Sequence, residues 1–250
     1  FDLSLAELLN IKIVSASLVD ESIHDAPSTV LVITEEQIRN RAYTDFEELM
    51  HDLPGFDVIE THGIIDNISH QRGHRTSFTT RTLMLIDGVL LNNVWTQGAH
   101  FAQFIPLSMI KRVEILYGPA GALYGANAFQ GVVNIISKST KDFANGETVL
   151  VSSNASLGKF ANKQAELFVM GKFENFSFEL GLKQYQTDGL DLSSVPAWGF
   201  LDEQRLNDRN IWGPILDRGD QGEPYGEFYS PTDTWGLFGK LHLGDFTLGL

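Results

Sequence analysis

The sequence contains no cysteine. Disulfide bonds, zinc–thiolate sites and cysteine nucleophiles are therefore excluded. Basic residues are also scarce, because 18 Lys and Arg stand against 32 Asp and Glu, and the formal net charge is −14. A charge of this sign disfavours nucleic acid as a partner, since its phosphates would be repelled.

Long apolar runs are missing as well. No run reaches the roughly 18 residues that a membrane-spanning helix needs. Any membrane-spanning structure would therefore have to be a β-barrel, because only helices and closed barrels satisfy every backbone polar group in lipid. The sequence opens at Phe1 without a basic and apolar leader, which fits a chain processed after secretion but leaves export undecided. Its 250 residues are enough for one or two domains.

Motifs for catalysis and for metal binding are not found. The sequence has no G-x-S-x-G, no H-E-x-x-H and no phosphate-binding loop, so we expect no catalytic residue, no enzyme activity and no cofactor. The four histidines between positions 62 and 100 have no companion acidic motif, and the acidic residues of 186–233 lack the Asp-x-Asp-x-Asp-Gly spacing of a calcium loop. We therefore expect no metal site and a solvated acidic loop.

The most distinctive stretch is IPLSMIKRVEILYGPAGALYGANAFQGVVNIISK, residues 105–138. Its β-branched and aliphatic residues predict two short strands, at 111–116 and 131–137. Four glycines in the stretch permit backbone angles or close approaches that a Cβ would block. From composition and spacing alone, this is a small-residue turn of an ordinary α+β domain.

The same stretch resembles the end of the plug domain in TonB-dependent outer-membrane receptors. That family has a Pro-containing turn, a strand of the form R-V-E-(I/V)-L, a G-P-x-x-x-L-Y-G loop and a segment G-(V/G)-(V/I)-N-I-I. LPGFDV at 53–58 and LMLIDGVLLNN at 83–93 resemble it too, so the likeness covers roughly 140 residues, the size of a domain. It implies an α+β plug domain over 1–141, followed over 142–250 by antiparallel β-strands of an outer-membrane β-barrel that is incomplete in this chain.

The short apolar segment near the start has two interpretations. From its pattern it is a lone edge strand or an unstructured tail. In the family, a segment at this place is the box that pairs with the periplasmic protein TonB, and a free strand with open backbone groups suits that role. The resemblance assigns this TonB box to Ile11, Lys12, Ile13, Val14, Ser15 and Ala16.

Two further sets of side chains gain a role from the resemblance. Loops at 61–70 and 93–103 correspond to plug apices that face the external medium, so we expect ligand contacts from His62, His70, Trp95, His100 and Phe101. A plug inside a barrel also needs polar contacts to the inner wall that can be broken and remade. We assign them to Arg72, Arg75, Arg112 and Glu114, for which ordinary surface salt bridges are the alternative.

Local signals predict the elements of the first domain. Thr34-x-x-Gln37 and Thr44-x-x-Glu47 are capping boxes that start two short helices, and Pro54-Gly55 ends the second. Phe46, Leu49 and Met50 give that helix one buried face. Strands are expected at 27–34 and 56–59. The dipeptide Asp87-Gly88 predicts a tight hairpin over 82–91.

After residue 141 the pattern changes to alternation of period two. Strands are predicted at 148–157, 164–173, 176–185, 234–243 and 246–250. In the third, Phe176, Phe178, Leu180 and Leu182 point one way, and Ser177, Glu179, Gly181 and Lys183 point the other. Short turns and one long loop at 186–233 are typical of outer-membrane barrels. Five strands cannot close a barrel of this family, so we expect the N-terminal part of a longer receptor.

We therefore predict a receptor that takes up a scarce ligand, such as a ferric siderophore or another iron- or cobalamin-type compound, with energy delivered through TonB and its inner-membrane complex. The expected partners are TonB, a small-molecule ligand that includes metal chelates, and outer-membrane lipid. Two alternatives stay open: a soluble periplasmic or secreted ligand-binding module, and a hydrolase that uses a His and Asp pair from the 62–100 region. The sequence offers no nucleophile motif for the hydrolase.

Overall fold

The computed structural model describes residues 12–17, 21–22, 28–60, 67–71, 73, 81–93, 99, 104–125, 127–144, 146–188 and 232–249. The chain divides into two compact units, one of residues 1–154, 166–183 and 236–250, the other of residues 155–165 and 184–235. The contacts between the plug and the strands lie within the first unit. The predicted domain boundary at residue 141 does not coincide with this division and stays a prediction.

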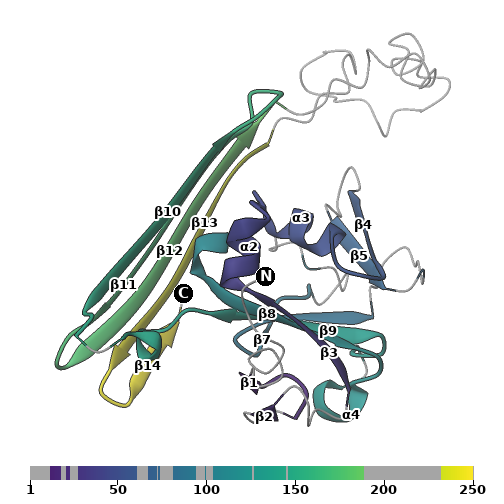
Figure 1. Ribbon diagram of the computed structural model, residues 1–250, viewed down its shortest axis with the longest axis horizontal. Helices are drawn as coiled ribbons and strands as arrows, with labels where there is room; N and C mark the ends of the chain where they lie inside the picture. Colours follow the sequence, from purple (N-terminus) through teal and green to yellow (C-terminus); the bar gives the residue numbers. More distant parts are fainter. Residues whose placement is uncertain are drawn as a thin grey trace, which may run out of the picture. The chain divides into compact units, whose positions relative to one another are not determined.

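A mixed five-stranded sheet forms the plug, in the order β3-β8-β9-β6-β7 (Figure 1). Its strands are β3 (Thr29–Thr34), β8 (Ile110–Tyr117), β9 (Gly131–Ser137), β6 (Thr82–Ile86) and β7 (Val89–Leu90). All neighbouring pairs are antiparallel except β6 with β9, which run parallel. The two strands predicted at 111–116 and 131–137 are thus β8 and β9, paired at the centre of the sheet.

The hairpin between β6 and β7 turns at the predicted dipeptide. Ile86 pairs with Val89, and both turn residues have positive φ, 48° at Asp87 and 82° at Gly88. Asp and Gly tolerate this conformation better than other residues, which is why the dipeptide predicts the turn.

Two short helices follow β3. Helix α2 (Glu35–Asn40) begins at the predicted capping box, in which the side chains of Thr34 and Gln37 each bond the other's backbone N–H. Helix α3 (Phe46–His51) begins one residue later than predicted. Its N-cap is Asp45, whose carboxylate accepts from the Glu48 N–H at 2.8 Å. The prediction of a Thr44 cap was wrong, because Asp caps at least as well as Thr and occupies the adjacent position.

The remaining elements of the plug are short. They are β1 (Lys12–Ile13) paired with β2 (Glu21–Ser22), β4 (Phe56–Glu60) paired with β5 (Asn67–Gln71), the helix α4 (Gly121–Tyr124), and the 3₁₀ turns η2 (Leu107–Met109) and η3 (Thr140–Asp142). No helix in the described part of the chain is both long enough and apolar enough to span a membrane.

The plug sheet is buried on both faces, because alternate residues of its strands enter two different cores. One face, with Ile33, Val113 and Ile135, packs against α2 and α3. The opposite face, with Val32, Leu85, Leu116 and Val132, packs against Ile13 and Ala16 from the N-terminal segment. The segment that was predicted to be a TonB box is therefore part of the second core.

A second five-stranded sheet follows, with strands in sequence order β10-β11-β12-β13-β14. The strands are β10 (Val149–Leu157), β11 (Lys163–Lys172), β12 (Phe176–Thr187), β13 (Thr232–Leu243) and β14 (Phe246–Gly249). All five predicted strands are present, with ends shifted by a few residues. The sheet is not closed into a barrel, and tight turns join β11 to β12 and β13 to β14.

Candidate functional site

The strands after the plug bury several polar side chains and expose many apolar ones. In β11, Glu166 is 4% exposed and Leu167 is 38% exposed; in β12, Glu179 is 6% and Leu182 is 39% exposed. Soluble sheets bury the apolar face instead. The alternation predicted for 176–185 is confirmed, with Glu179, Gly181 and Lys183 on the buried side.

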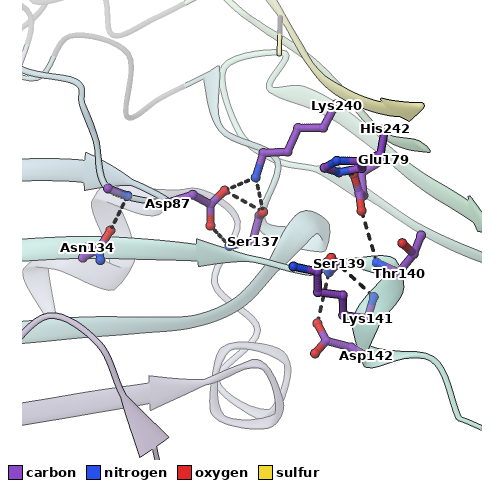
Figure 2. A network of polar contacts seen from close by, with 11 residues as sticks. Asp87, Asn134, Ser137, Ser139, Thr140, Lys141, Asp142, Glu179, Lys240 and His242 are labelled. Carbon is purple, nitrogen blue, oxygen red and sulfur yellow. Dashed lines mark hydrogen bonds and ion pairs between the residues drawn. The ribbon is translucent and has the colours of Figure 1, made fainter. Parts of the chain in front are cut away.

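Polar side chains of these strands contact the plug at three places. At the first, which we call the Lys240 anchor, the ammonium of Lys240 in β13 binds the Asp87 carboxylate and the Ser137 hydroxyl, the latter at 3.1 Å (Figure 2). Asp87 is itself held by Ser137, which donates from its backbone N–H at 2.9 Å and from its hydroxyl at 2.7 Å. Lys240 of β13 therefore contacts both the hairpin turn and the end of β9.

The second place, the Glu179 anchor, joins β12 to the turn η3. One carboxylate oxygen of Glu179 accepts from the Thr140 N–H at 3.1 Å, and the other lies 3.1 Å from Nε2 of His242. Figure 2 shows Glu179 between these two partners. His242 also contacts the Thr247 hydroxyl through Nδ1 at 2.9 Å, so the histidine links β13, β14 and the anchor.

The third place, the Glu166 anchor, joins β11 to the turn η2. Glu166 accepts from the Ser108 N–H at 3.1 Å and lies 3.2 Å from the ammonium of Lys183. The side chains of the ion pair are 0% and 2% exposed. Disruption of this buried ion pair is costly, because removal of one partner leaves the other charge uncompensated.

Apolar contacts accompany these polar ones. Phe168 and Met170 of β11, each 2% exposed, belong to the same core as the plug residues Met109 and Ile135. A Cβ at Gly236 of β13 would lie 2.4 Å from a plug backbone oxygen, so only glycine permits this approach. Small and apolar residues thus accompany the polar contacts and let the strands and the plug pack closely.

Described residues around the Lys240 anchor also line a cavity of about 370 Å³, most of whose walls are apolar. No three His, Asp or Glu side chains in the described ranges gather closely enough to hold a metal ion.

The N-terminal segment is held by one buried carboxylate. Glu114 of β8 is 0% exposed, and its Oε2 accepts from the Val14 N–H at 3.0 Å, the Ser15 N–H at 2.9 Å and the Ser15 hydroxyl at 2.6 Å. Its other oxygen accepts from Nε of Arg112 at 2.7 Å. A single side chain thus satisfies three donors of the segment.

Tyr124 of α4 adds a fourth bond to the segment. Its hydroxyl donates to the Ser15 carbonyl at 3.0 Å. Burial raises the pKa of Tyr124 above the usual 10.0, and the nearby Glu114 charge raises the pKa further, while the side chain of Ser15 lowers it. The hydroxyl is therefore neutral, and able to donate, throughout the physiological pH range.

The predicted site residues fall into four groups. Ile11, His62, Arg72, Arg75, Trp95, His100 and Phe101 lie outside the described residues. His70 lies in β5, opposite Asp57, and nothing of its side chain is described. The assigned box residues 12–16 lie in and after β1, where Ile13, Ser15 and Ala16 are buried.

Arg112 and Glu114 differ from the expectation that they contact the barrel wall. Their described partners are each other and the N-terminal segment, because the side of β8 that carries them faces the second core and not the strands. The residues that do contact the strands were missed as such: Asp87, Ser108, Ser137 and Thr140 from the plug, and Glu166, Glu179 and Lys240 from the strands. Polar residues on the inner side of each predicted strand were the available signal for the last three.

Comparison with known proteins agrees with this architecture. The family model of the TonB-dependent receptor plug domain matches residues 22–132. The vitamin B12 transporter BtuB of Vibrio vulnificus is 29% identical over 187 residues, which cover 72% of this chain and 28% of that protein.

Solved receptors share the fold. FpvA of P. aeruginosa, solved in complex with a heterologous pyoverdine and iron, has a TM-score of 0.61 at 16% identity, over 95% of this chain and 26% of FpvA. The ferric yersiniabactin uptake receptor FyuA of Yersinia pestis has a TM-score of 0.57 at 16% identity, over 94% of this chain and 31% of FyuA. The chain therefore spans between a quarter and a third of the length of these proteins. Residues 22–132 are therefore similar to the plug domain of TonB-dependent receptors, and the plug and the strands that follow it share the fold of solved outer-membrane receptors.

Proposed function

We propose that this chain is the N-terminal part of a receptor that imports a scarce ligand through the outer membrane with energy supplied by TonB. The ligand class we infer is a ferric siderophore or another iron- or cobalamin-type compound. Support comes from the relatives, since one is named as a vitamin B12 transporter and another as a ferric yersiniabactin uptake receptor. These relatives are transporters and receptors, which also favours a role without covalent catalysis.

One observation carries the proposal: the strands bury charge and expose hydrocarbon. Glu166, Glu179 and Lys183 are at most 6% exposed, whereas Val151 is 63%, Trp235 is 74% and Phe246 is 81% exposed. In water, each such apolar side chain would forgo a burial free energy of about 1.5–3 kcal/mol. In a lipid bilayer the same face is favourable, and the polar face belongs inside.

The N-terminal segment is the proposed contact for TonB. Its docked form offers little to a partner, because Ile13 and Ala16 are 0% and 2% exposed and both amides next to them are bonded to Glu114. Strand addition needs free backbone donors and acceptors. We infer that the segment must leave Glu114 before TonB can bind it.

The proposed ligand contacts remain those from the sequence: His62, His70, Trp95, His100 and Phe101 at the plug apices. Histidine and aromatic side chains suit planar chelates and metal complexes, because they combine an apolar surface with a polar edge.

The soluble ligand-binding module is the alternative in another class. It requires that the apolar face of β12 be covered by protein, whereas Phe176 and Leu182 are 40% and 39% exposed. Extraction of the natural full-length product from its host envelope separates the two. The receptor needs detergent and migrates differently before and after heating, and a product that high salt releases would refute the receptor.

Uptake is tested by accumulation of radiolabelled cyanocobalamin and of a panel of ferric siderophores in the host. Accumulation should be lost when the gene for this receptor is deleted, and also when TonB is deleted. A receptor lacking residues 11–16 should reach the membrane in normal amount and bind ligand without accumulating it. Uptake that persists without TonB would contradict the energising step.

A further inference from the structure

The hydroxyl of Ser15 is the start of a chain of hydrogen bonds that leaves the N-terminal segment. It donates to Glu114 at 2.6 Å and accepts from Nδ2 of Asn134 at 3.0 Å. Ser15 is 0% and Asn134 4% exposed, so neither side chain has water as a ready substitute partner. Asn134 lies opposite Glu114 in the β8–β9 ladder, on the face that holds the N-terminal segment.

Asn134 also contacts the hairpin turn. Its Oδ1 accepts from the Gly88 N–H at 3.3 Å, a bond drawn in Figure 2. The neighbouring Asp87 N–H donates to the Ile135 carbonyl at 2.8 Å. These two bonds fix the backbone of the turn between β6 and β7 to β9, in addition to the two bonds between Asp87 and Ser137.

Asp87 extends the series of contacts to the opposite face of the sheet. Its carboxylate is the centre of the Lys240 anchor, with Ser137 and Lys240 as partners. Ser15, Asn134, Gly88, Asp87 and Lys240 therefore form a continuous series from the N-terminal segment to strand β13. The Glu179 and Glu166 anchors share no residue with this series.

We propose that this series couples the docking of the N-terminal segment to the Lys240 anchor, and that Asn134 is the positioning residue that joins them. Withdrawal of Ser15 removes the acceptor of a buried amide, and a buried donor without a partner is costly. Rotation of the Asn134 amide towards a new partner recovers a bond and gives up the one to Gly88. The turn then loses one of its bonds to β9, and Asp87, which keeps its bonds to Ile135 and Ser137, is held less firmly beside Lys240.

The consequence is an order of release. When the segment is withdrawn, the plug loosens from β13 first and stays attached to β11 and β12 through the other two anchors. That TonB is what withdraws the segment rests on the proposed function. The coupling between Ser15 and Lys240 is a property of the fold and holds without TonB and without ligand.

The test is hydrogen exchange measured by mass spectrometry on the full-length receptor in detergent, with neither TonB nor ligand present. Ser15→Ala removes only the hydroxyl. We expect amides of residues 87–91 and of Ser137 to exchange about two- to tenfold faster, the range for loss of one buried hydrogen bond. The Thr140 amide, which bonds Glu179, should exchange at the wild-type rate.

Ser139→Ala is the matched control, because it makes the same chemical change beside the Glu179 anchor, where the Ser139 hydroxyl caps η3. It should affect residues 139–142 and leave 87–91 unchanged. Ser15→Thr keeps the hydroxyl and should restore the wild-type exchange at 87–91, which guards against a variant that merely folds poorly.

A double-mutant cycle supplies the second measurement, since coupling appears as non-additivity. Lys240→Met alone should speed exchange of the Ser137 amide, and Ser15→Ala should add little in that background. Additive effects, exchange confined to residues 12–17, or equal acceleration at 87–91 and at Thr140 would each overturn the coupling. Because no transport is measured, these results stand apart from any failure of the uptake experiments.

Discussion

Replacement of Glu114 by alanine should release the N-terminal segment from the plug. The carboxylate is fully buried and accepts four hydrogen bonds, three from the segment and one from Arg112. Glu114→Ala leaves all four donors without their acceptor. Glu114→Gln keeps the size but brings an amide NH₂, which must face either Arg112 or the segment, so one side loses its acceptor.

The magnitude follows from the bonds. A hydrogen bond to a charged group contributes about 1.5–3 kcal/mol, and removal of one partner of a buried ion pair costs about 3–5 kcal/mol. The released donors of the segment regain water, so the effects do not add fully. We expect Glu114→Ala to weaken docking of the segment by about 3 kcal/mol, more than a hundredfold in the docking equilibrium, and Glu114→Gln to weaken it by roughly half that free energy.

The assay is electron paramagnetic resonance of a nitroxide at Ser17→Cys in the full-length receptor, since this part of the chain has no cysteine to compete for the label. The docked segment should give a broad spectrum and the released one a sharp spectrum, with Glu114→Gln between them. Glu147→Ala, which removes an exposed carboxylate far along the chain, is the control and should match wild type. A broad spectrum in Glu114→Ala, indistinguishable from wild type, would refute the reasoning.

Three further predictions concern the strands and the tyrosine. Gly236→Ala places a Cβ 2.4 Å from the Phe104 carbonyl oxygen and should destabilise the folded receptor by about 1–3 kcal/mol in denaturant titration, whereas Gly249→Ala, with open space around it, should cost less than 1 kcal/mol. Leu182→Lys puts a charge on the proposed lipid face at a cost of about 2–4 kcal/mol near the bilayer midplane, so it should lower the yield of heat-modifiable receptor. A lysine introduced on the inner side of the strand would not test contact with lipid. Because the pKa of Tyr124 is raised, its bond to Ser15 is fully present below pH 10.0 and is lost as the pH rises through the raised value. The nitroxide spectrum should therefore stay broad from neutral pH to about 10 and sharpen above it. Tyr124→Phe should abolish this alkaline step. An identical alkaline step in Tyr124→Phe would assign it to another group.

Local physical chemistry let the sequence alone determine much of the fold. The Thr34 cap, the Asp87-Gly88 turn and the alternation of β12 each depend on residues only a few positions apart, and each was found where it was predicted. The Thr44 cap failed by one position, because two capping residues stand side by side and the sequence does not rank them. The resemblance to the plug family rests on the R-V-E-I-L and G-V-V-N-I-I segments, whose residues form the paired strands β8 and β9 of the plug.

Only the tertiary structure decided which polar and charged side chains contact each other. Glu114 and Ser15 are 99 positions apart, and Asp87 and Lys240 are 153 positions apart. Such pairs depend on strand order and on which face of a sheet each side chain occupies, and neither follows from local propensity. The sequence identified Glu114 as a charged residue of the plug, but its position on β8 turned it towards the N-terminal segment and left the contacts with the strands to Asp87, Ser108, Ser137 and Thr140.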